Sequence, residues 1–119
     1  MIISEKKLEN AQMEIRVEVP ENRVETEYKS VFEKIRGNAK IDGYRKGKVP
    51  LELIERKFSE MADQEVAENL LRSVYLDAVT EKNYRPIAPP RFNFDRIKRG
   101  EGFAFTAVFE TMPEIELGD

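Results

Sequence analysis

The sequence has 119 residues, 40% of them hydrophobic and 36% charged, and a net charge of −3. This balance is typical of one folded domain with a hydrophobic core, and it excludes a disordered chain. The absence of Cys excludes disulfides and thiolate catalysis, and the absence of His removes the commonest general base and metal ligand.

The first part of the chain predicts a strand followed by a helix. Apolar and charged residues alternate over 11–20, which indicates a half-buried strand ended by Pro20. The spacing then becomes helical, with Asn22 as the expected N-cap and Gly37 or Asn38 as the expected stop. The expected buried stripe of this helix consists of Val24, Tyr28, Val31, Phe32 and Ile35.

Two more helices are expected after a glycine-containing loop. Pro50 suits the first turn of a short helix that runs through Phe58. Ser59 is the expected cap of a longer helix that ends near Asn83. The apolar stripe of the longer helix consists of Val66, Leu70, Val74 and Ala78.

The last part of the chain predicts two strands, at 91–98 and 103–112, joined by a hairpin turn at 99–102. With the strand at 11–20 they indicate an α+β fold: a small antiparallel sheet, made of one N-terminal strand and a C-terminal hairpin, packed against helices. The hairpin phenylalanines are expected mainly in the core. The alternative is a surface for unfolded apolar segments or a second copy of the domain. These residues are Phe92, Phe94, Phe103, Phe105 and Phe109.

The most informative segment lies between the first two helices. Two glycines bracket an aromatic residue and two cations, a third cation follows, and a proline closes the segment: Gly43-Tyr44-Arg45-Lys46-Gly47-Lys48-Val49-Pro50. Because glycine adopts backbone angles forbidden to other residues, Gly43 and Gly47 are expected to shape a tight tip. Tyr44, Arg45 and Lys46 would then point outward, and Pro50 would fix the exit.

Charge is concentrated around this loop. Residues 36–50 contain five cations and one carboxylate, a net charge of +4, so the rest of the chain carries −7. An acidic body with one basic loop approaches a polyanion in one orientation. The structural alternative is a solvated lysine-rich loop. The cations that would support the tip are Arg36, Lys40 and Lys48.

The residues for enzymatic chemistry are not arranged in a known pattern. The loop differs from a phosphate-binding loop in its glycine spacing, and Val49 stands where Ser or Thr must meet magnesium. No His is available to activate a serine. Carboxylate pairs such as Glu65 with Glu68, or Asp63 with Glu65, are expected by chance among 23 acidic residues. We therefore predict no catalytic residue, no cofactor and no metal site.

The loop closely resembles the signature of the bacterial trigger factor family, in its ribosome-binding N-terminal domain. That signature usually reads Gly-Phe-Arg-Lys-Gly, a basic or polar residue, an aliphatic residue and Pro. The departure is Tyr44, where Phe is usual. The resemblance extends over nearly the whole chain, and residues 113–117 look like the family's junction to its next domain.

The resemblance implies that residues 1–119 form a single ribosome-binding domain of a cytoplasmic chaperone, cut from a longer chain. Full-length members also carry a prolyl isomerase domain and a C-terminal chaperone domain. The implied partners are the ribosomal large subunit, through an exit-tunnel protein and adjacent RNA, and nascent unfolded polypeptide. No membrane partner is implied, and a homodimer is plausible. The implied docking residues are Tyr44, Arg45 and Lys46. The alternative is a stand-alone RNA-binding module that uses the same loop.

Overall fold

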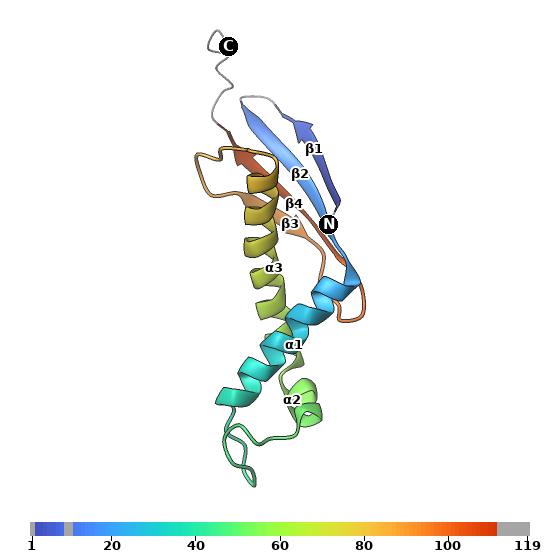
Figure 1. Ribbon diagram of the computed structural model, residues 1–119, viewed down its shortest axis with the longest axis vertical. Coiled ribbons are helices and arrows are strands. Elements are labelled where there is room, and N and C mark those ends of the chain that lie inside the picture. Colours follow the sequence, from blue (N-terminus) through green and yellow to red (C-terminus); the bar gives the residue numbers. More distant parts are fainter. Residues whose placement is uncertain (1, 9–10, 112–119) are drawn as a thin grey trace. The chain divides into compact units, whose positions relative to one another are not determined.

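The computed structural model describes residues 2–8 and 11–111, and its fold is of the predicted α+β class (Figure 1). Four strands form one sheet in the order β1-β2-β4-β3, so β1 and β3 are the edge strands. In chain order the elements are β1 (Ile2–Lys7), β2 (Gln12–Val19), α1 (Glu21–Asn38), α2 (Leu51–Lys57), α3 (Ser59–Glu81), β3 (Arg91–Phe94) and β4 (Phe103–Glu110).

The chain folds into two compact units. Within the described residues, the first comprises 2–8, 11–19, 71–96 and 104–111 and contains the sheet and the second half of α3. The second comprises residues 20–70 and 97–103 and contains α1, α2 and the first half of α3. None of the helices described is both long and apolar enough to cross a bilayer. The expected junction at residues 113–117 lies outside the described residues.

The N-terminal part of the sheet contains one strand more than predicted. β2 confirms the strand expected at 11–20, because alternate side chains, from Met13 to Val19, are buried. β1 pairs antiparallel with β2, in a register that joins Lys7 to Met13. Its residues 4–7 are polar and exposed. An edge strand with little buried surface lacks the alternation that reveals a strand in sequence, and the expectation of a single N-terminal strand was therefore wrong.

The C-terminal hairpin is shorter than predicted. β3 ends at Phe94, which pairs with Phe105 of β4, and the expected strand to residue 98 is wrong. The chain leaves the sheet there because residues 97–103 belong to the second unit, where Ile97 is buried. The turn lies at 98–101, one residue before the predicted 99–102, since the Glu101 amide donates to the Lys98 carbonyl at 3.3 Å. Gly100 allows this turn with φ +91°.

Most hairpin phenylalanines are in the core of the fold, as expected. Tyr75 of α3 makes edge-to-face contacts with Phe92 and Phe109, at centroid distances of 5.5 and 5.7 Å. Phe92 also contacts Phe105, at 5.7 Å. The second half of α3 therefore covers this face of the sheet. Phe94 differs from the others, because it is 44% exposed.

Helix α1 buries the stripe that its periodicity predicts, from Val24 to Ile35. The expected N-cap at Asn22 is wrong. The N-cap is Pro20, and its carbonyl accepts the amides of Arg23 and Val24 at 3.1 and 3.2 Å. Proline fixes φ near the value needed at this boundary, so the helix begins at Glu21, two residues earlier than an N-cap at Asn22 would place it.

Helices α2 and α3 are almost continuous. Pro50 does not lie in the first turn of α2, as predicted, but is its N-cap, and its carbonyl accepts the amides of Leu53 and Ile54. Phe58 alone separates the helices, and its carbonyl accepts the amide of Ala62 at 2.9 Å. Ser59 therefore begins α3 instead of capping it. The predicted end near Asn83 is confirmed, since this residue is left-handed, with φ 56°.

Candidate docking loop

The candidate site is the loop between α1 and α2, in the second unit (Figure 1, teal to green). Two successive turns shape it. The Tyr44 amide donates to the Ile41 carbonyl at 3.1 Å, and the Lys48 amide donates to the Arg45 carbonyl at 2.9 Å. A glycine with positive φ occupies the third position of each turn, as a type II turn requires: Gly43 at +89° and Gly47 at +82°. Both glycines therefore have the positive φ that a tight tip at this place requires.

The tip side chains face solvent. Tyr44 is 45% exposed, and Arg45 and Lys46 are exposed beside it, at the point where the first turn passes into the second. Among the described residues, none of these three side chains has a hydrogen-bond or ion-pair partner. The supporting cations Lys40 and Lys48 are exposed and lack side-chain partners in the same described part of the chain. A ring, a guanidinium and an ammonium are thus free to meet another molecule.

The exit of the loop is held from inside the fold. Val49 is fully buried, with 0% exposure, although the residues on either side of it are exposed. Its carbonyl accepts a hydrogen bond of 2.8 Å from Nε of Arg36, in the last turn of α1. Arg36 is therefore in a different position from the other loop cations, because it points at the backbone of the loop. Sequence reasoning grouped it with the solvent-facing cations and did not identify Val49 as an anchor.

Two of the three carboxylates that were considered for catalysis, Asp63 and Glu65, make contacts between helices. The hydroxyl of Tyr28 on α1 donates to Asp63 on α3 at 2.6 Å. Lys34 on α1 donates to Glu65 on α3 at 2.9 Å. Both contacts join α1 to α3. Among the residues that the structure describes, no group of His, Cys, Asp and Glu is arranged to hold a metal ion.

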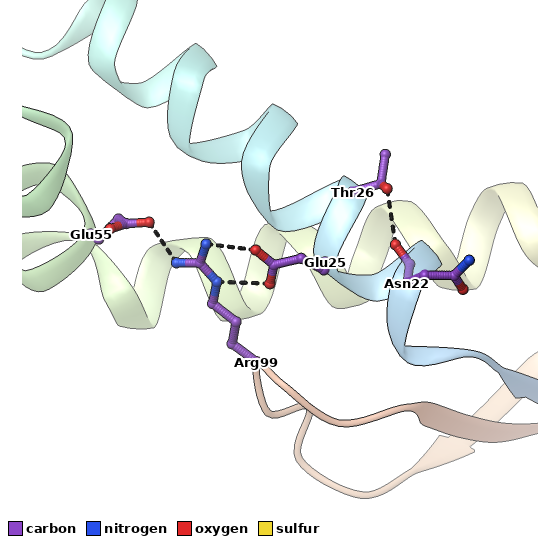
Figure 2. A network of polar contacts seen from close by, with 5 residues as sticks. All are labelled: Asn22, Glu25, Thr26, Glu55 and Arg99. Atoms are coloured by element: carbon purple, nitrogen blue, oxygen red, sulfur yellow. Dashed lines mark hydrogen bonds and ion pairs between the residues drawn. The ribbon is translucent and has the colours of Figure 1, made fainter.

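A second polar feature of this unit was not predicted. Arg99, in the turn before β4, pairs with a carboxylate on each of two helices (Figure 2). It binds Glu25 of α1 in a fork, with Nε and Nη2 at 3.0 and 2.8 Å from the two carboxylate oxygens, and Nη1 lies 2.6 Å from Glu55 of α2. Its guanidinium also lies 5.8 Å from the ring centroid of Tyr28 and 5.3 Å from that of Phe32.

These contacts shift the ionisation of the paired groups. The hydrogen bonds that Arg99 donates to the Glu25 and Glu55 carboxylates raise the pKa of Arg99 above its ordinary value. The hydrogen bond from Arg99 lowers the pKa of Glu25 below its ordinary value, against a smaller effect of burial. Arg99 thus links the turn to the two helices that flank the docking loop. In the sequence Arg99 is one of 20 cations, and no local pattern distinguishes it from the others.

The fold and the loop together define a class: an α+β domain that presents an aromatic residue and several unpaired cations on a loop shaped by glycine. A family model described as bacterial trigger factor protein (TF) matches residues 1–119. The chain therefore belongs to the bacterial trigger factor family.

Individual relatives agree with this assignment. The chain is 35% identical over 119 residues to trigger factor of Geobacter sp. (strain M21) and 39% identical over 112 residues to that of Geobacter sulfurreducens. It is 38% identical over 117 residues to trigger factor of Haemophilus ducreyi. These alignments cover 100%, 94% and 98% of this chain, but only 27%, 26% and 27% of the relatives. The chain thus spans about a quarter of their length.

A solved structure shares the fold. It comes from work on promiscuous substrate recognition in the folding and assembly activities of the trigger factor chaperone. The TM-score is 0.74 at 18% sequence identity, over 96% of this chain and 27% of that chain. At this identity the likeness supports the fold alone.

Proposed function

We propose that this chain is the ribosome-docking domain of a cytoplasmic nascent-chain chaperone, and that it docks through residues Gly43–Pro50. The observation that carries the proposal is the tip itself. Tyr44, Arg45 and Lys46 are exposed and unpaired within the described residues, while the loop behind them is fixed by two turns and a buried valine. Exposed functional groups on a loop positioned by a rigid scaffold are typical of binding sites.

Each tip residue suits a different part of a ribosomal surface. The planar fork of Arg45 can pair in a bidentate manner with a carboxylate of a large-subunit protein or with a phosphate of RNA. Lys46 contributes a mobile point charge, supported by Lys40 and Lys48. The ring of Tyr44 can enter an apolar contact, and its hydroxyl needs water or a polar partner. An interface of so few contacts is expected to be small, salt-sensitive and transient.

The activities of the whole protein are a separate part of the proposal. Shelter of nascent chains and prolyl isomerase activity are proposed for the full-length protein. This chain spans only 26 to 28% of the length of the trigger factors that it matches. Its own role would be to bring the chaperone to the emerging chain. We propose no catalytic residue within it.

Co-sedimentation with bacterial ribosomes tests the proposal. The triple variant Tyr44→Ala, Arg45→Ala, Lys46→Ala removes the tip. The matched control, Arg56→Ala with Lys57→Ala, also removes two cations, both exposed on α2 and unpaired within the described residues. We expect the parent and the control to pellet with ribosomes and the triple variant to remain in the supernatant. Equal pelleting of all three would contradict docking by the tip.

The alternative is a stand-alone RNA-binding module. It is favoured by the unpaired cations of the loop, and it predicts binding to naked ribosomal RNA with an affinity that falls by about 0.7 to 0.9 log units per log unit of salt for each phosphate neutralised. A parallel assay with protein-free RNA separates the two candidates. Binding to ribosomes but not to naked RNA supports docking on a combined protein and RNA surface.

A further inference from the structure

The two ends of the docking loop meet at residues 36–39 and Val49, which we call the neck of the loop. The neck depends on a contact of Arg36. Arg36 and Val49 are 13 positions apart in sequence, and the hydrogen bond between them joins the last turn of α1 to the residue two positions before α2. The other side of the neck is held by Ala39, which is buried and donates its amide to the Ile35 carbonyl at 2.7 Å. Everything between these two points is the loop with its two turns.

The Val49 carbonyl needs a donor from outside the local backbone. Val49 precedes proline, and a residue in that position is kept away from helical angles. Pro50 is itself extended, with φ −56° and ψ 137°, and α2 begins only at Leu51. The Val49 carbonyl therefore lies outside the hydrogen-bonding pattern of the helix. A backbone carbonyl beside a buried side chain is costly to leave unpaired. Nε of Arg36 supplies the donor at 2.8 Å.

The orientation of Arg36 separates it from the other cations of the segment. Its side chain is 33% exposed, and its Nη1 lies 3.7 Å from Glu33, one turn earlier on α1. The guanidinium is therefore engaged on two sides by its own fold. Lys40, Lys46 and Lys48, by contrast, are exposed and unpaired within the part of the chain that the structure describes.

We infer that Arg36 is a positioning residue of the docking loop: it fixes the neck through the Val49 carbonyl and does not contact the ribosome. This inference rests on the proposed docking function. Loss of the Nε donor would free the exit of the loop, and the two turns would sample more conformations. The affinity for ribosomes would fall, because binding would then have to order the tip, and this ordering costs conformational entropy.

The test uses Arg36→Met, which keeps an unbranched apolar stem and removes every donor. Its matched control is Lys40→Met, an exposed cation four positions along the chain. Two quantities are measured for each: the affinity for ribosomes at several salt concentrations, and the backbone order parameters of Tyr44 and Lys48 from ¹⁵N relaxation. The order parameters report motion on the picosecond to nanosecond timescale without any ribosome.

For Arg36→Met we expect affinity to fall by about tenfold, as for loss of one hydrogen bond to a charged group. The slope of log affinity against log salt should stay at the parental value, because no ion pair with the partner is lost. The order parameters of Tyr44 and Lys48 should decrease. Lys40→Met should leave the order parameters unchanged and make the salt slope shallower.

A shallower salt slope with unchanged order parameters in Arg36→Met would make Arg36 a direct contact and overturn the inference. Parental behaviour in both measurements would overturn it as well. If Arg36→Met does not fold, as judged by circular dichroism, Arg36→Leu carries the same test, because its apolar side chain also has no donor. Failure of the parent to bind ribosomes would contradict the docking function instead, and the order parameters would still decide whether Arg36 orders the loop.

Discussion

The Arg99 contacts lead to a stability prediction that can be worked out from the structure. Arg99→Ala removes three charge-assisted hydrogen bonds, two to Glu25 and one to Glu55, and the approach of the guanidinium to two aromatic rings. The side chain is 35% exposed, so solvent weakens each ion pair to about 0.2 to 1 kcal/mol. The ring contacts add about 0.5 to 1 kcal/mol.

Together these contacts predict that Arg99→Ala lowers the free energy of unfolding by about 2 kcal/mol, a substantial part of the 5 to 15 kcal/mol that is usual for a domain. With a urea m-value of about 1 to 3 kcal/mol/M, the midpoint should fall by about 0.7 to 2 M with m unchanged. The assay is urea unfolding followed by circular dichroism at low and at high salt. The difference should shrink at high salt, because exposed charges are screened.

Lys98→Ala is the control for this prediction. Lys98 is exposed, adjacent in sequence and unpaired within the described residues, so its loss should change stability by less than about 0.5 kcal/mol. A double-mutant cycle of Arg99→Ala with Glu25→Ala should give a coupling energy of about 1 kcal/mol. The reasoning is refuted if Arg99→Ala is as stable as Lys98→Ala, or if the coupling is zero.

Three further predictions concern pH, backbone strain and a buried hydroxyl. Because Arg99 lowers the pKa of Glu25 from its ordinary 4.5, this carboxylate stabilises the fold above pH 4.5, and the contribution is lost as pH falls through the folded-state pKa. The difference in unfolding free energy between the parent and Glu25→Gln should therefore narrow from pH 7 to pH 3 in urea titrations. A constant difference would contradict this prediction. Gly47→Ala should lower the free energy of unfolding by about 1 kcal/mol because of its φ of +82°, and not because of a clash, since an added Cβ would meet no atom within 4 Å. Gly37→Ala within α1 should instead raise the free energy of unfolding by about 0.5 to 1 kcal/mol. Equal urea midpoints for the two variants would argue against backbone strain at Gly47. Tyr75→Phe should leave thermal stability unchanged or raise it by up to about 1 kcal/mol, because the Tyr75 hydroxyl is buried without a partner among the described residues and burial raises its pKa. A marked drop in Tm would reveal a bond to that hydroxyl.

The parts of the fold that follow from sequence are those with a regular pattern and a buried face. The stripe of α1, from Val24 to Ile35, and the alternation of β2 were both read from periodicity and are confirmed. β1 was missed because residues 4–7 are polar and exposed along a sheet edge. The early end of β3 at Phe94 was missed because the following residues join the other unit, and that is decided by tertiary packing.

The same distinction applies to the candidate site. The two turns of the loop follow from Gly43 and Gly47, since the need for positive φ is a local property. The contact of Arg36 with the Val49 carbonyl and the contacts of Arg99 with two helices join residues far apart in sequence. A charged side chain carries no local sign of whether it turns to solvent or to a distant backbone group. The docking role of the tip stays a prediction until ribosome binding is measured.

The separation of tip from anchor has a consequence for how this surface can change. Tyr44, Arg45 and Lys46 are exposed and make no side-chain bonds within the described residues, so substitutions there are expected to cost little stability. The buried Val49 is subject to the opposite constraint. A library that randomises the three tip positions should therefore consist mostly of folded members. Selection, in the laboratory or in evolution, could then retune what the loop recognises while the scaffold beneath it remains the same.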